Sequence, residues 1–198
     1  MKKPLQLATR GIHHLALNTE DMRATVDFYT QVVGMPLVHA MKVPPGLGTG
    51  PGNRGNPPYE HIRHYFFDMG NDSLLAIFEY PKGLPKQHRD HVGGMQHIAF
   101  HVPPGKFDAL IGRVKSCRVE VIGPVSLGGR FWSAYLFDPF GIRLEFATDR
   151  SGGQQGVVES VLQSEGEARA ELETLFSNPK EVQKWLRHMP LKKETAAA

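Results

Sequence analysis

The 198-residue chain has a single cysteine, Cys117, which excludes an intramolecular disulfide framework. No apolar run approaches membrane-spanning length, and residues 1–10 lack the apolar core of a signal peptide. The formal net charge is only +3, and no basic run with interleaved aromatic residues argues for nucleic acid. We therefore expect a cytoplasmic protein that has neither a membrane nor a nucleic-acid partner.

The chain contains an internal repeat. Residues 12–17 (IHHLAL) recur as residues 95–100 (MQHIAF). Each copy is followed by a helix-like run, residues 22–33 in the first half and residues 107–114 in the second. The repeat predicts two modules of the same construction.

Each module opens with a histidine and closes with a carboxylate among apolar neighbours. The histidines are His14 and His97, and the carboxylates are Glu79 and Glu145. Paired imidazole and carboxylate groups on strands are typical metal ligands. We predict a metal site of two histidines and two carboxylates at the interface of the two halves.

The alternation of side chains along the strands supports this hypothesis for three of the four ligands. His14, His97 and Glu145 each lie on the face opposite the large apolar residues of their strand. Glu79 instead shares its face with the large apolar residues. We expect helices on one side of the sheet and a ligand-lined surface on the other.

Four segments in a characteristic order resemble the vicinal oxygen chelate superfamily. They are residues 11–17, residues 27–29 (DFY), residues 95–100 and residues 135–145 (YLFDPFGIRLE). This superfamily includes glyoxalase I, methylmalonyl-CoA epimerase, fosfomycin-resistance proteins and extradiol ring-cleaving dioxygenases.

The resemblance implies an α+β fold, in which two tandem βαβββ modules form a cupped eight-stranded mixed sheet. It also implies a divalent metal ion (Zn, Ni, Co, Mn or Fe) held in the cup by His14, Glu79, His97 and Glu145. Members of the superfamily commonly form dimers, and we expect a homodimer that acts on a small-molecule substrate.

The domain organisation follows from the repeat and from composition. We predict an N-terminal arm (1–10), a first module (11–80), a second module (81–150), and a linker with a helical extension (151–198). The first module carries a loop insertion at 44–58, which contains five glycines and five prolines. The loop is either a tolerated surface insertion or a lid over the pocket.

The C-terminal extension contains two predicted amphipathic helices. The first covers residues 165–176, and the second begins at Asn178 and Pro179, an N-cap followed by proline. These helices pack either on the chain's own sheet or across the homodimer. We expect Trp185 and Leu186 to contribute to the dimer.

The four-ligand set favours proton-transfer chemistry. An ion in such a site polarises substrate oxygens as a Lewis acid. By resemblance to glyoxalase I, Glu145 is the base, with Glu79 its counterpart. The prediction is lyase or isomerase chemistry on a small substrate with adjacent oxygens.

Two alternatives remain open. An extradiol-type Fe(II) dioxygenase needs only two histidines and one carboxylate, and Tyr135 matches the position of its catalytic tyrosine. However, residues 126–130 lack the histidine that those dioxygenases usually place there. The other alternative is a resistance or small-molecule-binding protein.

The candidates for substrate binding are polar and aromatic residues in the third strand of each module. They are Arg63, Tyr65, Trp132 and Tyr135. The aromatic members are alternatively core residues.

Overall fold

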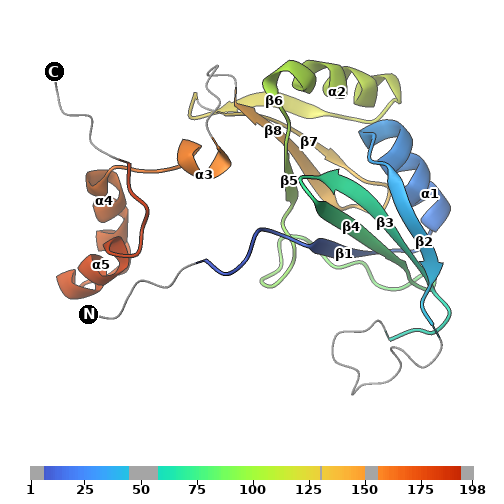
Figure 1. Ribbon diagram of the computed structural model, residues 1–198, viewed down its shortest axis with the longest axis horizontal. Coiled ribbons are helices and arrows are strands. Elements are labelled where there is room, and N and C mark those ends of the chain that lie inside the picture. Colours follow the sequence, from blue (N-terminus) through green and yellow to red (C-terminus); the bar gives the residue numbers. More distant parts are fainter. Residues whose placement is uncertain (1–6, 45–57, 130, 150–155, 193–198) are drawn as a thin grey trace. The chain divides into compact units, whose positions relative to one another are not determined.

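The computed structural model describes residues 7–44, 58–129, 131–149 and 156–192 (Figure 1). The chain divides into two compact units, Ala8–Arg150 and the terminal segments Met1–Leu7 with Ser151–Ala198. Almost all of the predicted loop insertion 44–58 lies outside the described residues, and both alternatives for it stay predictions. No helix in the described ranges is long and apolar enough to cross a membrane.

The Ala8–Arg150 unit consists of two βαβββ modules. The elements of the first are β1 (His14–Thr19), α1 (Met22–Asp27), η1 (Phe28–Val33), β2 (Leu37–Lys42), β3 (Arg63–Gly70) and β4 (Ser73–Glu79). Those of the second are β5 (Ile98–His101), α2 (Pro104–Ser116), β6 (Ile122–Leu127), β7 (Phe131–Phe137) and β8 (Arg143–Asp149). The predicted α+β fold with tandem modules is confirmed.

The eight strands form two four-stranded sheets, with the orders β1-β4-β3-β2 and β5-β8-β7-β6. In each sheet the first strand pairs in parallel with the last strand of its module, and the other pairs are antiparallel. The first and last strands, which carry the predicted ligands, therefore lie side by side within each module.

The first helix has clear start and stop signals. The Asp21 side chain caps α1 by accepting a hydrogen bond from the backbone N–H of Ala24 at 3.0 Å. The helix continues as the π-helix η1 and ends at Gly34, where φ is +89°. A Cβ atom at Gly34 would lie 2.6 Å from the Arg113 guanidinium, which donates to the carbonyl of Val33. Because this φ is in the left-handed region, glycine is favoured at this position, and a larger residue would also displace the Arg113 side chain.

One hydrophobic core serves both modules. Its largest fully buried members come from both sheets and both helices: Tyr29, Phe67, Leu75, Phe107, Leu144 and Phe146. The helices α1 and α2 lie beside each other (Figure 1), and the Tyr29 hydroxyl donates to Asp138 of the second module at 3.2 Å. Because each sheet turns one face to this shared core, its opposite face points away from it. We call this opposite face the ligand face of the module.

The C-terminal unit contains three helices, α3 (Val157–Ser160), α4 (Glu165–Leu175) and α5 (Pro179–Leu186). The predicted N-cap of α5 is confirmed, because the Asn178 side chain accepts from Lys180 N at 3.0 Å and Pro179 is the first helical residue. The apolar stripes of α4 and α5 form a cluster of their own: Ala168, Leu172, Val182 and Leu186.

Candidate metal centre

The second module brings two of the predicted ligands together. Glu145 pairs with Ala99 in the β5–β8 register, and His97 lies two residues before Ala99. Both side chains therefore lie on the ligand face. His97 Nε2 is 3.0 Å from Glu145 Oε2, and the Glu145 residue is only 7% exposed.

The hydrogen bonds around this pair suit a cation. The Ser133 hydroxyl donates to Glu145 Oε1 at 2.5 Å, and Gln96 Oε1 contacts His97 Nδ1. With Nδ1 donating to Gln96, the lone pair of Nε2 faces a carboxylate oxygen, an arrangement that needs a proton or a metal ion between the two atoms. Two ligands at right angles on an ion with bonds of about 2.1 Å are about 3 Å apart. The donor set thus fits a divalent ion.

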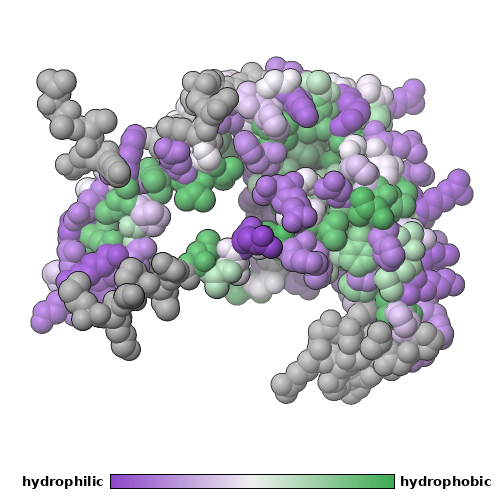
Figure 2. Space-filling model, viewed as in Figure 1, coloured by the Kyte–Doolittle hydropathy of each residue, from purple (hydrophilic) through white to green (hydrophobic). Residues whose placement is uncertain are grey.

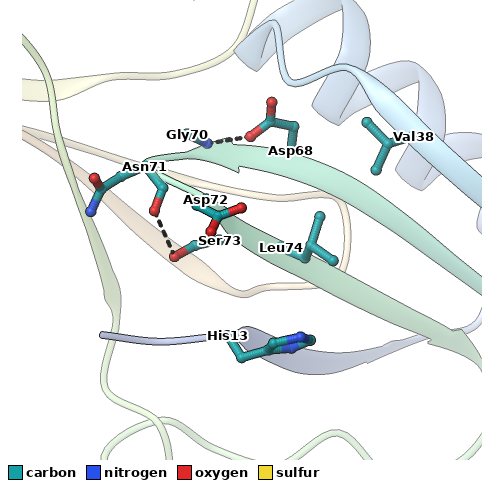
Figure 3. A pocket seen from close by; sticks show the side chains of 8 residues that line it. All are labelled: His13, Val38, Asp68, Gly70, Asn71, Asp72, Ser73 and Leu74. Carbon is teal, nitrogen blue, oxygen red and sulfur yellow. Dashed lines mark hydrogen bonds between the residues drawn. The ribbon is translucent and has the colours of Figure 1, made fainter. Parts of the chain in front are cut away.

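His14 lies on the ligand face of the first module. It is the first residue of β1 and is exposed, with its Nδ1 atom 2.9 Å from His13 Nδ1. This contact leaves His14 Nε2 available. His13 borders a cavity of about 600 Å³ at the β3–β4 turn, whose other lining residues include Val38, Asp68, Asp72 and Leu74 (Figure 3).

Glu79 does not share a face with His14. Glu79 pairs with Thr19 in the parallel β1–β4 register, on the side of the shared core. In the first module, the position equivalent to Glu145 is Ala76. It pairs with Ala16, which lies two residues after His14, as the partner of Glu145 lies two residues after His97. Glu79 lies three residues after Ala76, so it is on the opposite face of β4 from Ala76, and its role as a metal ligand stays a prediction.

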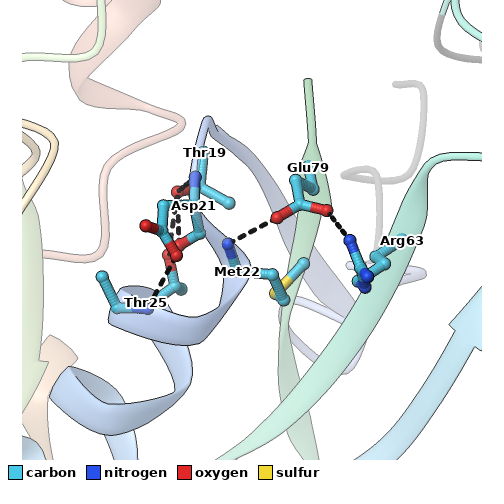
Figure 4. A network of polar contacts seen from close by, with 7 residues as sticks. Thr19, Asp21, Met22, Thr25, Arg63 and Glu79 are labelled. Carbon is cyan, nitrogen blue, oxygen red and sulfur yellow. Dashed lines mark hydrogen bonds and ion pairs between the residues drawn. The ribbon is translucent and has the colours of Figure 1, made fainter. Parts of the chain in front are cut away.

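Glu79 instead stabilises the start of α1 (Figure 4). Its Oε1 atom accepts a hydrogen bond from Met22 N at 2.8 Å, and its Oε2 atom pairs with the Arg63 guanidinium. A carboxylate at a helix N-terminus is favourable because it meets unpaired N–H groups and the positive end of the helix dipole. Both carboxylate oxygens therefore have a structural role, and we leave Glu79 out of the ligand set.

One of the four predicted substrate-binding residues lies on a ligand face. Tyr135 is the strand partner of Glu145 and shares its face. The other three lie on the core side of their strands: Arg63, Tyr65 and Trp132. Arg63 and Tyr65 are on the same face of β3 as the buried Phe67, and Trp132 is on the same face of β7 as the buried Ala134. A substrate-binding role for these three stays a prediction.

The surroundings of Tyr135 keep its hydroxyl neutral. Burial raises the pKa of Tyr135, and the nearby Glu145 charge raises it further. The Arg143 guanidinium lies over the Tyr135 ring, with Cζ 4.4 Å from the ring centroid. Tyr135 is thus a neutral phenol that can donate a hydrogen bond, and it lies beside the Glu145 carboxylate.

His64 lies on the ligand face of the first module, where it stacks on Phe78 with ring centroids 3.7 Å apart. Burial, together with smaller contributions from the neighbouring His14 and His39, lowers the pKa of His64 to about 4. Its Nε2 atom is buried without a hydrogen-bond partner among the described residues. His64 is therefore neutral near pH 7.

Three residues of the ligand faces were not predicted: Ser133, Arg143 and His64. For the first two, a signal exists in the β7–β8 turn, where Asp138 accepts hydrogen bonds from Phe140 N and Ile142 N. This turn sets the pairing of the two strands, so alternation places Ser133 and Arg143 on the face of Glu145. No comparable turn signal marks His64.

A larger cavity of about 930 Å³ follows β1 and the segment that joins the modules. It contains none of the predicted site residues. The ion pair between Lys86 and Glu20, at 3.7 Å, spans part of it.

The four predicted ligands do not meet within the chain. In the described ranges, no group of three His, Cys, Asp or Glu side chains could hold one ion. His97 and Glu145 come together, whereas His14 stands apart from them. The cause is the shared core, which lies between the modules and turns their ligand faces away from it.

The family model of the Glyoxalase/Bleomycin resistance protein/Dioxygenase superfamily matches residues 11–146, about two thirds of the chain. No protein with curated annotation matches. The matched range begins before β1 and ends in β8, so it covers both modules and none of the C-terminal helices.

Solved structures share this fold. A glyoxalase/dioxygenase from Nostoc punctiforme is 23% identical, with a TM-score of 0.52, over 72% of this chain and 92% of that chain. The fosfomycin resistance protein FosX from Listeria monocytogenes is 19% identical, with a TM-score of 0.52, over 72% of this chain and 96% of that chain. A mutant of FosX was solved with Mn(II) and 1S,2S-dihydroxypropylphosphonic acid.

Proposed function

The chain belongs to the glyoxalase/bleomycin resistance protein/dioxygenase superfamily, and from this membership we propose that it is a metal-dependent enzyme. Its substrate is a small molecule with two neighbouring oxygens, and its reaction is a proton transfer of the lyase or isomerase type. The observation that carries the proposal is the buried Glu145 carboxylate, held between Ser133 and His97 on the ligand face.

The proposed metal ligands are His14, His97 and Glu145. Two imidazoles and one carboxylate form a set that binds divalent transition metals and leaves positions open for substrate oxygens. Because His14 stands apart from the other two in one chain, a second copy supplies it. The proposed enzyme is therefore a homodimer in which each metal centre draws on both chains.

Exposed apolar side chains on the ligand faces support this pairing. Three residues of β6 on the ligand face, together with Phe137 of β7, are exposed, and Val38 is exposed beside the cavity of the first module. Figure 2 shows apolar side chains at the visible surface among polar ones. The β6 residues are Ile122, Val125 and Leu127. Apolar patches that are left open on a monomer mark interaction surfaces. In the proposed dimer, contact between the ligand faces of two chains would remove these apolar side chains from water.

The chain's own groups provide an acid and a base at neighbouring positions. When bound, a divalent ion supplies Lewis-acid polarisation of the substrate oxygens. Glu145 would act as the base through Oε2, a ligand oxygen that can loosen from the ion, and would take a proton from the substrate carbon next to the chelating oxygen, while Ser133 holds Oε1 in place. The Tyr135 phenol, which stays protonated, donates a hydrogen bond to the substrate oxygen. Return of the proton to the adjacent carbon completes an isomerisation.

The second candidate is an Fe(II)-dependent ring-cleaving dioxygenase. The three-donor set without Glu79 favours it, since two histidines and one carboxylate are the typical ligands of non-haem iron oxygenases. Proton transfer is preferred because Glu145 and Tyr135 form an acid–base pair on one face.

The experiment that separates the two candidates uses protein purified without chelator and loaded with Mn(II) or Fe(II). Proton transfer predicts deuterium exchange from solvent into the glutathione adduct of methylglyoxal or into an acyl thioester. Glu145→Gln is expected to lower this exchange by about 100-fold or more. Oxygen uptake with catechol, in the absence of any exchange, would show that the dioxygenase is the correct assignment.

A further inference from the structure

Arg143 is a charged residue next to the candidate metal centre. Arg143 lies two residues before Glu145 on β8, on the same face and half buried. Side chains two apart on a strand are separated by about 7 Å. Its guanidinium lies over the Tyr135 ring, with Cζ 4.4 Å from the ring centroid, beside the acid–base pair.

The described residues offer Arg143 no ion-pair partner. The nearest carboxylate along the strand, Glu145, is engaged by Ser133 and His97. On the ligand face of the first module, the Asp68 carboxylate accepts a hydrogen bond from Gly70 N at 2.7 Å. Among the described residues, the interaction that the geometry shows for the Arg143 charge is therefore the cation–π contact with the Tyr135 ring.

A second guanidinium approaches the same corner of the face. Arg89 lies over the ring of Phe137, with Cζ 5.4 Å from the centroid, and Phe137 is the strand partner of Arg143. The Nε atom of Arg89 is buried without a hydrogen-bond partner in the described part of the chain. Asp90, an exposed residue, balances part of its charge at 3.6 Å.

We infer that Arg143, held over the Tyr135 ring, anchors an oxyanion of the substrate. This inference rests on the proposed function and names its substrate class: a small molecule with a carboxylate or phosphate-type group near the two chelating oxygens. Guanidinium groups bind such oxyanions through two parallel hydrogen bonds. A second copy of the chain that covers this face would bury Arg143 further, and an unpaired buried charge is costly. An anionic substrate removes this cost.

The spacing agrees with a compact substrate. About 7 Å separates same-face positions such as Arg143 and Glu145, so an oxyanion and the reacting carbon fit within a few bonds of each other. A neutral substrate of the same size would leave the guanidinium unpaired. The site therefore selects anionic over neutral molecules.

The test is calorimetric titration of the full-length protein with benzoate, phenyl phosphate and the neutral benzamide, in metal-free and Mn(II)-loaded forms. The wild type is expected to bind at least one of the two anions about tenfold more tightly than benzamide. Arg143→Gln is expected to remove this preference, and Arg143→Lys to keep part of it. The matched control is Arg23→Gln, because Arg23 is an exposed arginine on α1.

The two anions distinguish a carboxylate site from a phosphate site. Equal binding of benzamide and both anions, or an Arg143→Gln protein that keeps the wild-type preference and melting temperature, would overturn the inference. So would loss of stability in Arg143→Gln and Asp68→Asn alike with no anion binding, which would assign Arg143 to an ion pair between chains. Anion binding by the metal-free form separates the result from the proposed function, since it does not depend on the metal.

Discussion

Two glutamates that close the two modules have different surroundings. Glu145 lies on a ligand face with an imidazole 3.0 Å away, whereas Glu79 binds the first backbone N–H of α1 and the Arg63 guanidinium. The two glutamates point to opposite faces because successive side chains on a strand alternate, so a shift of one residue moves a side chain to the other face. The same residue type therefore caps a helix in the first module and, in the proposed function, acts as ligand and base in the second.

This difference gives the first prediction. Glu79→Gln is expected to keep the metal content of the protein and to lower the free energy of unfolding by about 1 kcal/mol, the usual value of a helix cap. Glu145→Ala, which removes the ligand oxygens altogether, is expected to lose most of the metal. Elemental analysis after dialysis and urea unfolding measure the two effects. Metal loss in Glu79→Gln equal to that in Glu145→Ala would restore Glu79 to the ligand set.

His64 predicts a dependence of stability on pH. Its pKa is lowered to about 4 in the folded chain, from the ordinary value of 6.5, so the unfolded chain binds a proton first as the pH falls. The contribution of His64 to stability is therefore complete above pH 6.5 and is lost between pH 6.5 and about 4. Urea unfolding of metal-free protein at pH 7.5 and at pH 5.0 measures it. His64→Gln is expected to reduce the loss, whereas His188→Gln is expected to leave it unchanged.

At the level of elements, alternation along single strands predicted the ligand faces of His14, His97 and Glu145. The pairing of strands could not be predicted in the same way. Within β4, parity alone does not show that Glu79 lies opposite Thr19, because this depends on the register of two strands far apart in sequence. The same limit explains Trp132, whose core-side position follows from the β7–β8 register.

The turn between β7 and β8 gives the third prediction. Asp138 is buried, accepts two backbone hydrogen bonds within the turn, and also accepts from the Tyr29 hydroxyl of the other module. Asp138→Ala is expected to lower the free energy of unfolding by about 2–3 kcal/mol, because it leaves buried donors unpaired. Asp138→Asn keeps an acceptor oxygen and is expected to cost less than half as much. Equal losses in the two variants, measured by urea unfolding, would contradict this role.

The C-terminal helices give the fourth prediction. Leu186 is buried in the cluster of α4 and α5, whereas Trp185 is 47% exposed and contacts only the Phe176 ring among aromatic side chains of the described residues. Leu186→Ala is expected to reduce the helical content. Trp185→Ala is expected to keep the helices and to weaken the dimer, as measured by sedimentation velocity over a range of concentrations. A dimer of unchanged strength in Trp185→Ala would remove this residue from the interface.

At the level of the whole molecule, the shared core is the physical reason for proposing a partner chain. The helices that bury the core side of both sheets also keep the two ligand faces apart. The sequence repeat predicted a site between two halves, and the proposal now places these halves on different chains. In this proposal, one core stabilises the chain and two chains form each metal centre.

The most direct test of this claim is the metal content of a mixed dimer. His14→Ala and His97→Ala chains, each with its own affinity tag, are coexpressed, and the dimer that carries both tags is isolated. Each variant alone is expected to hold no metal, whereas the mixed dimer has one complete centre and is expected to hold about one ion per dimer. Elemental analysis that finds the mixed dimer as empty as the two parents, while the wild type holds about two ions per dimer, would contradict the account.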